Sequence, residues 1–167
     1  MARIDAILSS ETIIASDRRI DALFADYGAS HSVRGNLLCH AAGITLIVFG
    51  LLSFLARVPI AGVCTASELL IVLAFGFYSA LDFPLALAVL GYASILDVAA
   101  RAAGSWPLGL AAFAAGWVLQ GIGHAVYEKN RPAFLRNLVH LLVGPAYLVA
   151  EALGMRRAAA GVSRRSS

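Results

Sequence analysis

Long runs of apolar residues dominate the sequence, separated by short segments rich in polar residues, glycine and proline. The runs cover approximately residues 37–56, 66–80, 83–100, 106–123 and 138–153. Because a helix needs about 20 apolar residues to cross the hydrocarbon core of a bilayer, the pattern predicts an all-α, polytopic membrane protein with four crossing helices. The second and fifth runs are short, and Gly144-Pro145 in the fifth should kink a helix or turn it back. We therefore expect a kinked or re-entrant fifth segment.

Local signals place several helix ends and one helix contact. Thr65 followed by Glu68 forms a capping box ahead of the second run, and Asp82 separates the second run from the third. In the fourth run, Ala112-xxx-Gly116 presents small residues one turn apart. Such pairs allow close approach of a neighbouring helix in a membrane.

The residues before the first run follow a different pattern. Ser16 can cap a helix with apolar residues on one face. These residues are Ile20, Leu23, Phe24 and Tyr27. The spacing predicts an amphipathic helix lying at the bilayer interface, and a helix packed on the membrane domain remains an open alternative. The expected organisation is an N-terminal interfacial segment over residues 1–30, a helical membrane domain over 31–155 and a disordered basic tail over 156–167.

Composition supports a membrane protein and argues against nucleic-acid binding. The chain is 60% hydrophobic and 14% charged, whereas soluble domains are about half apolar and a quarter charged. The formal net charge of +3 comes from scattered basic residues without a basic, aromatic-rich stripe. Cys39 and Cys64 form no CxxC motif and are expected to be buried thiols.

All four histidines lie at the edges of apolar runs, where imidazoles are costly and usually functional. They are His31, His40, His124 and His140. If the first four runs all cross, parity places all four imidazoles on one membrane face. Four imidazoles together, without another strong catalytic group, indicate a metal site.

Basic residues identify the membrane face that carries the histidines. Those expected on this face are Arg18, Arg19, Arg34, Lys129, Arg131 and Arg136. The opposite face has Arg57 and Arg101, and a fully crossing fifth segment would add Arg156, Arg157, Arg164 and Arg165 to it, whereas a re-entrant one would not. The positive-inside rule therefore makes the histidine face cytoplasmic.

Spacing suggests how the imidazoles converge and what orients them. His31 and His40 would lie on opposite sides of a continuous helix, so we expect the chain to bend between them, at Gly35. Asn36 stands one turn before His40, and Asn137 lies about one turn before His140. Both asparagines can orient imidazoles. Glu128 follows His124 by one helical turn and is a candidate for a catalytic role or an occasional ligand.

Two blocks of sequence together resemble a known family. The first is Tyr27…His31-x4-Asn36-x3-His40-x2-Gly43, and the second is Gln120-x2-Gly123-His124-x3-Glu128-x3-Pro132-Ala133. Asn137 and Pro145 follow at the expected places. The region from Tyr27 to about Glu151 resembles the small polytopic membrane Fe(II)-dependent 2-hydroxy fatty acid dioxygenases of fatty-acid α-oxidation, found in bacteria and in the fungal endoplasmic reticulum.

The resemblance implies an Fe(II) enzyme that uses O2 to convert a 2-hydroxy fatty acid into CO2, water and the acid one carbon shorter. The substrate loses four electrons, which fully reduce one O2, so no other reductant is needed. The resemblance makes the four histidines the metal ligands. Basic residues at the interface would attract the substrate carboxylate, the candidates being Arg34, Lys129, Arg131 and Arg136.

Other protein classes remain open at this point. Membrane di-iron hydroxylases need about eight or more histidines, so four favour a mononuclear site. A zinc-dependent membrane hydrolase could use Glu128 as its base. A non-enzymatic lipid-binding membrane protein with interfacial histidines is a third possibility. The sequence does not define the oligomeric state or the chain length of a substrate.

Overall fold

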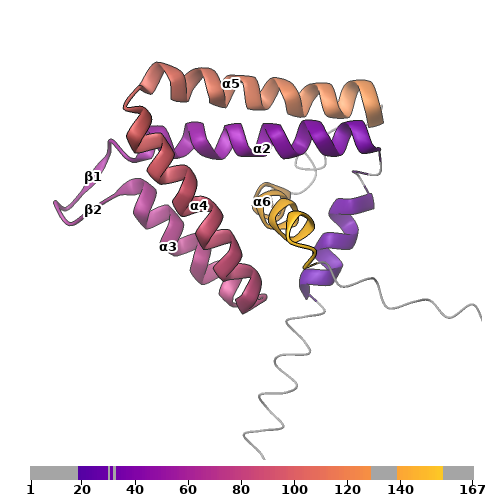
Figure 1. Cartoon of the computed structure of the whole chain (residues 1–167). Helices are drawn as coiled ribbons and strands as arrows, with labels where there is room; N and C mark the ends of the chain where they lie inside the picture. The colour runs from indigo at the N-terminus through magenta and orange to yellow at the C-terminus, as the bar shows by residue number, and fades with distance from the viewer. Residues whose placement is uncertain (1–18, 30, 32, 129–138, 156–167) are drawn as a thin grey trace, which may run out of the picture.

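Helices build nearly all of the computed structural model, which describes residues 19–29, 31, 33–128 and 139–155 (Figure 1). Residues 19–29 are helical. The later elements are α2 (Arg34–Leu55), β1 (Pro59–Ile60), β2 (Cys64–Thr65), α3 (Ala66–Ser79), α4 (Phe83–Ala103), α5 (Trp106–Ile122), the π-helix η1 (Gly123–Glu128) and α6 (Val139–Ala152). The two short strands pair antiparallel. The expected all-α class is confirmed.

Helices α2 and α5 lie side by side and antiparallel (Figure 1). Glycines form their interface: a Cβ on Gly50 would lie 2.5 Å from the Gly109 carbonyl oxygen, and one on Gly116 would lie 2.6 Å from that of Gly43. Apolar helices associate in lipid through such close packing, because lipid tails are as apolar as their side chains. The contact predicted at Gly116 is therefore present, and it fixes the start of α2 beside the end of α5.

Helices α3 and α4 form a second antiparallel pair, inclined to the first (Figure 1). The capping box is present, because the Thr65 N–H donates to a Glu68 carboxylate oxygen at 2.7 Å. Asp82 caps α4 by accepting from the Leu85 N–H at 2.7 Å. Near the end of α4, Arg101 donates to Thr65 Oγ1 at 2.6 Å and so ties the two helices together.

Three helical stretches are long and apolar enough to cross a membrane: Arg34–Leu55, Phe83–Ala103 and Trp106–Tyr127. Helix α3 has 14 residues, about 21 Å at 1.5 Å per residue, which is less than the roughly 30 Å hydrocarbon core. Three of the four predicted crossing helices therefore have the necessary length. Helix α3 starts at the capping box and ends before Asp82, as the sequence indicates.

The helix over residues 19–29 packs on the protein. Ile20, Phe24 and Tyr27 are buried in a core cluster with residues of α3, α4 and α6. The Phe24 ring meets the Tyr147 ring edge-on, with centroids 5.5 Å apart. The apolar face expected to lie in the bilayer interface is thus covered by other helices, which is the alternative that the sequence left open. Ser16, the expected cap, lies outside the described residues.

Helix α6 supplies one side of the core. It continues through Pro145 without turning back at Gly144. The 14 residues that the structure describes are by themselves too few for a perpendicular crossing. Gly144, Ala146, Tyr147 and Ala150 are buried, so this apolar helix is held by the protein.

Candidate metal centre

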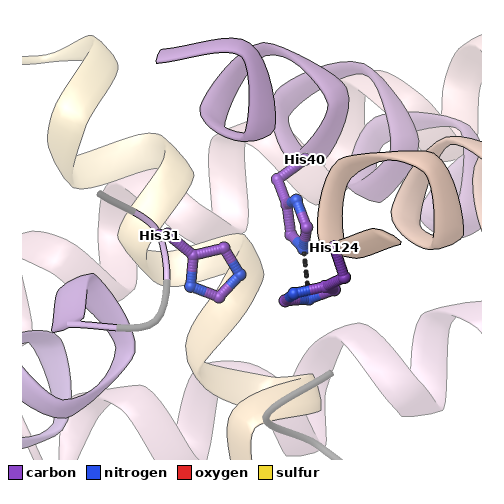
Figure 2. A group of neighbouring side chains, drawn as sticks. All are labelled: His31, His40 and His124. Atoms are coloured by element: carbon purple, nitrogen blue, oxygen red, sulfur yellow. Dashed lines mark hydrogen bonds between the residues drawn. The ribbon is translucent and has the colours of Figure 1, made fainter. Parts of the chain in front are cut away.

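His31, His40 and His124 converge from three different elements (Figure 2). His31 lies in the link between the helix over residues 19–29 and α2, His40 lies in the second turn of α2, and His124 lies in η1. All three are buried, and each offers a ring nitrogen within 4.8 Å of the nitrogens offered by the other two. This is the group of residues in the described structure that could hold a metal ion.

Backbone carbonyls determine which ring nitrogens can bind a metal. His31 Nδ1 lies 2.7 Å from the Tyr27 carbonyl oxygen, and His40 Nδ1 lies 3.0 Å from that of Asn36. A carbonyl oxygen can only accept, so both Nδ1 atoms carry the proton and donate. The lone pairs of His31 and His40 are therefore on Nε2, and this is the usual way in which a second hydrogen bond fixes the tautomer of a metal-binding histidine.

The spacing of the cluster fits a single ion. His40 Nε2 and His124 Nε2 lie 3.1 Å apart (Figure 2). Bonds from imidazole nitrogen to a divalent transition metal are about 2.0–2.1 Å long, so two nitrogens at this separation can reach the same ion. Three neutral imidazoles suit iron, copper, nickel or zinc and leave further coordination positions open.

The π-helix η1 brings His124 to the cluster. Its first residue, Gly123, faces α2, where an added Cβ would collide with Asn36 Oδ1 and would lie 3.2 Å from His40 Nδ1. An interrupted helical ladder of this kind often occurs at a functional site. Because residue 123 has no side chain, η1 can pack directly against the turn of α2 that carries His40.

The bend between His31 and His40 lies earlier than the sequence suggested. Val33, with φ −88° and ψ 129°, is extended and precedes α2, whereas Gly35 is already in the first turn of the helix. Gly35 has a different role, because a Cβ there would collide with the Tyr127 ring of η1. Its lack of a side chain brings η1 close to α2.

Asn36 contacts the site in another way than expected. Its backbone carbonyl holds His40, as described above. Its side chain is fully buried, and neither amide atom has a hydrogen-bond partner in the part of the chain that the structure describes. The orientation of His40 therefore depends on the main chain at position 36 in this structure.

His140 lies beside the cluster but outside it. Its Nε2 pairs with an Asp26 carboxylate oxygen at 2.8 Å, and the Tyr27 ring lies edge-on to it. Tyr27 in turn stacks on His31, with centroids 4.0 Å apart. Burial, with a smaller effect of Tyr147, raises the pKa of the Tyr27 phenol, so Tyr27 is a neutral packing surface. The Asp26–His140 pair thus fastens the helix over residues 19–29 to α6 beside His31.

The remaining predicted site residues lie apart from the three imidazoles or outside the described residues. Glu128 is the last residue of η1, and its side chain lies outside what the structure describes; Arg34 is exposed at the start of α2. Lys129, Arg131, Arg136 and Asn137 lie outside the described residues. The structure therefore brings together three of the four predicted histidines.

A cavity of about 80 Å³ adjoins the histidines. Its polar wall consists of Tyr27, Gln120 and the four histidines. Its apolar wall consists of Ile44, Ile47, Val48, Trp117, Leu141, Gly144 and Pro145. A second apolar cavity of about 150 Å³ shares Tyr27, His40, Ile44 and Gly144 with the first. This arrangement suits an amphiphile with its polar end at the imidazoles.

The sequence matches a family model described as 2-hydroxy-palmitic acid dioxygenase Mpo1-like over residues 18–156. The chain belongs to the Mpo1-like family. The matched region contains all four histidines and every residue that lines the two cavities. The family resemblance found in the two sequence blocks is therefore confirmed.

A characterised member of the Mpo1-like family is similar over most of its length. The 2-hydroxy-palmitic acid dioxygenase MPO1 of Saccharomyces cerevisiae (strain ATCC 204508 / S288c) is 32% identical over 126 residues, which cover 74% of this chain and 72% of the relative. No solved structure gives a significant match.

Gln120 is a residue of the cavity to which the sequence analysis gave no role. It appeared there only as part of the second Mpo1-like block, although its distance of four residues from His124 places both side chains on one helical face. The structure puts Gln120 in the cavity wall, buried, and one turn before the candidate ligand. The i, i+4 spacing was the signal that could have identified it.

Proposed function

We propose that the protein is a membrane dioxygenase that uses Fe(II) and O2 to shorten a 2-hydroxy fatty acid by one carbon, releasing CO2. The carrying observation is the buried cluster of His31, His40 and His124 at the polar end of an apolar cavity. Membership of the Mpo1-like family and the printed name of the yeast relative support the substrate class. The proposed reaction balances, since oxidation of the substrate by four electrons reduces one O2 to water.

In this proposal His31, His40 and His124 hold the ion through their Nε2 atoms. Bound Fe(II) would supply a Lewis acid for the carboxylate and 2-hydroxyl of the substrate together with redox chemistry toward O2. The carbonyls of Tyr27 and Asn36 keep the Nδ1 protons of His31 and His40 in place. Ile44, Val48 and Trp117 provide an apolar wall for the acyl chain and exclude water from the polar end.

The proposed location is the membrane, with the histidines at the cytoplasmic face. Three helices of spanning length support a bilayer environment. The start of α2, which carries His40, lies beside the end of α5, which leads into His124 (Figure 1). His31 directly precedes α2, so the parity argument expects all three histidines on one membrane face. Arg34, exposed next to this end, suits both an anionic lipid surface and an approaching carboxylate.

Membership of the Mpo1-like family gives less support to the alternative of a zinc hydrolase. That mechanism requires a base close to the metal-bound water, and the proposed base was Glu128. Glu128 is the last residue of η1, and its side chain lies outside what the structure describes. The dioxygenase proposal needs no carboxylate at this position.

The decisive experiment measures turnover and metal content together. Purified protein reconstituted anaerobically with Fe(II) should consume one O2 per 2-hydroxypalmitic acid and form the acid with one carbon less, without 2-oxoglutarate or NADH. One iron per chain should accompany activity. Palmitic acid without the hydroxyl serves as the control substrate. Two metals per chain, or no shortened acid from an iron-loaded sample, would contradict the proposal.

A further inference from the structure

Gln120 is a buried polar residue that the mechanism above does not use. Its exposed fraction is 7%, and it lines the cavity beside His40 and His124. No hydrogen bond of its carboxamide is seen among the residues that the structure describes, and its amide atoms are not sealed from solvent. Its amide oxygen and NH2 group therefore remain available to a ligand that enters the cavity.

Gly43 explains how the Gln120 carboxamide is placed. A Cβ on Gly43 would lie 3.0 Å from Gln120 Nε2, so the side chain extends from α5 toward the α2 backbone at the turn after His40. Any larger residue at position 43 would occupy this space. The glycine interface between the two helices therefore also makes room for a polar group next to the imidazoles.

Asn36 is a second buried amide near His40, but it is less accessible than Gln120. Both of its amide atoms are sealed from solvent, and Oδ1 lies against Gly123, so a ligand in the cavity cannot reach them. The amide atoms of Gln120 are not among these sealed atoms, and Gln120 borders the cavity. Of the two buried amides near His40, Gln120 is the one that a ligand can contact.

A carboxamide has one oxygen that accepts and an NH2 group that donates. A 2-hydroxy acid presents a complementary pair of neighbouring groups, a hydroxyl that donates and a carboxylate that accepts. An acid without the 2-hydroxyl presents only the acceptor. The histidine nitrogens available for the metal cannot make this distinction, because their lone pairs would be used by the ion.

We propose that Gln120 recognises the 2-hydroxy acid head group, accepting from the 2-hydroxyl through Oε1 and donating to the carboxylate through Nε2. This inference rests on the proposed function. It makes Gln120 a determinant of selectivity for 2-hydroxy acids over unsubstituted acids of the same length, because a site that hydrogen-bonds a substrate hydroxyl disfavours an analogue that lacks it.

The test measures binding in the absence of turnover. Full-length protein in detergent is loaded with Zn(II), and calorimetry gives the Kd of 2-hydroxypalmitic acid and of palmitic acid. Replacing Gln120→Leu should weaken binding of the hydroxy acid about 10-fold or more, since hydrogen bonds to charged groups are worth about 1.5–3 kcal/mol. The affinity for palmitic acid should fall less, so the preference for the hydroxy acid should shrink.

Two further variants complete the experiment. Val118→Leu, on the same helix but 60% exposed, should leave both Kd values unchanged. Gln120→Glu keeps the length of the side chain and should bind both acids more weakly than wild type, because it removes the donor and repels a carboxylate. If the leucine variant does not fold, unchanged Kd values for both acids in Gln120→Glu would overturn the proposal.

The outcomes separate this inference from the proposed function. Equal Kd values for wild type and Gln120→Leu would show that Gln120 does not bind the 2-hydroxyl. Equal fold-losses of affinity for the two acids in Gln120→Leu would show the same. A wild-type protein that neither binds nor converts 2-hydroxypalmitic acid would reject the proposed function itself.

Discussion

His31, His40 and His124 differ in how firmly the chain holds them. His40 sits inside α2 and donates to the carbonyl one turn earlier, and His124 is fixed by the packing of η1 on α2. His31 lies outside a helix, where a hydrogen bond to the Tyr27 carbonyl oxygen and stacking on the Tyr27 ring hold it. The positions of His40 and His124 are therefore set by the helix pair, whereas that of His31 depends on the N-terminal helix.

Replacing His40→Ala or His124→Ala should reduce turnover to background, because each change removes a ligand and with it the coordination of the ion. Cys39→Ala is the matched control, since its side chain points about 100° away from that of its neighbour on the helix. Oxygen consumption and iron content of the purified variants provide the measurement. Full activity in both histidine variants would leave the metal centre without support.

The Asp26–His140 pair gives a second prediction. Asp26→Ala and His140→Phe should each weaken metal binding a few-fold, because the helix that positions Tyr27 and His31 loses its tie to α6. The double variant should be little worse than either single variant, since both remove the same bond. Metal affinity is measured by titration with Co(II), whose absorption spectrum reports the ligands.

The same spectrum distinguishes positioning from ligation by His140. If His140 positions its neighbours, the Co(II) spectrum of His140→Phe keeps the wild-type shape at saturating metal. A changed spectrum at saturation would instead make His140 a ligand, as the sequence analysis expected.

Local sequence could identify the cluster but not its connections. The sequence identifies the histidines because imidazoles are rare at the ends of apolar runs and because the number of crossing runs between them places all four on one membrane face. The Asp26–His140 pair joins residues 114 positions apart, and no local spacing predicts such a contact. The bend was placed at Gly35 because glycine is permissive, whereas the structure uses Gly35 for close packing against Tyr127.

At the level of helices, the glycine interface can be tested by a matched pair of variants. Gly116→Ala should destabilise the protein by about 1–3 kcal/mol, because the new Cβ would lie 2.6 Å from the Gly43 carbonyl oxygen. Gly121→Ala, with no atom within 4 Å among the described residues, should be neutral or slightly stabilising through helix propensity. Thermal unfolding in detergent compares them. Similar stabilities for the two variants would argue against the interface.

The apolar runs and the helix-capping residues between them predicted the helices well. The expected runs over 66–80 and 138–153 correspond to α3 (Ala66–Ser79) and α6 (Val139–Ala152). The π-helix was not predicted, because its residues fit an ordinary helical pattern and the change depends on packing against α2. The sequence could not decide whether the apolar face of the N-terminal helix packs on lipid or on protein, because both offer an apolar surface to an amphipathic helix.

For the whole molecule, the arrangement of α2 and α5 predicts which loops share a membrane face. Single cysteines at Arg34, which is exposed, and at Glu128, the last residue of η1, should react with an impermeant reagent from the same side. A cysteine at Val63, 89% exposed in the β1–β2 turn, should react from the opposite side. The background lacks Cys39 and Cys64. Labelling of positions 34 and 128 from opposite sides would exclude this topology.

Removing the metal should destabilise the protein as well as inactivate it. An ion bound to the folded state alone raises stability according to its concentration relative to Kd. A chelator should therefore lower the Tm of wild type but leave that of His124→Ala unchanged. Calorimetry in detergent with and without chelator measures both. An unchanged wild-type Tm would contradict metal binding by the folded state.

The positions of the three histidines make the ion a cross-link as well as a cofactor. His40 and His124 are 84 residues apart in sequence, so an ion bound to both would close a loop comparable to one closed by a disulfide. Cross-links of that span remove about 4–5 kcal/mol of chain entropy from the unfolded state in simple models. A chain made without iron would unfold more often and be degraded faster, so iron supply would control the amount of the protein in the cell as well as its activity.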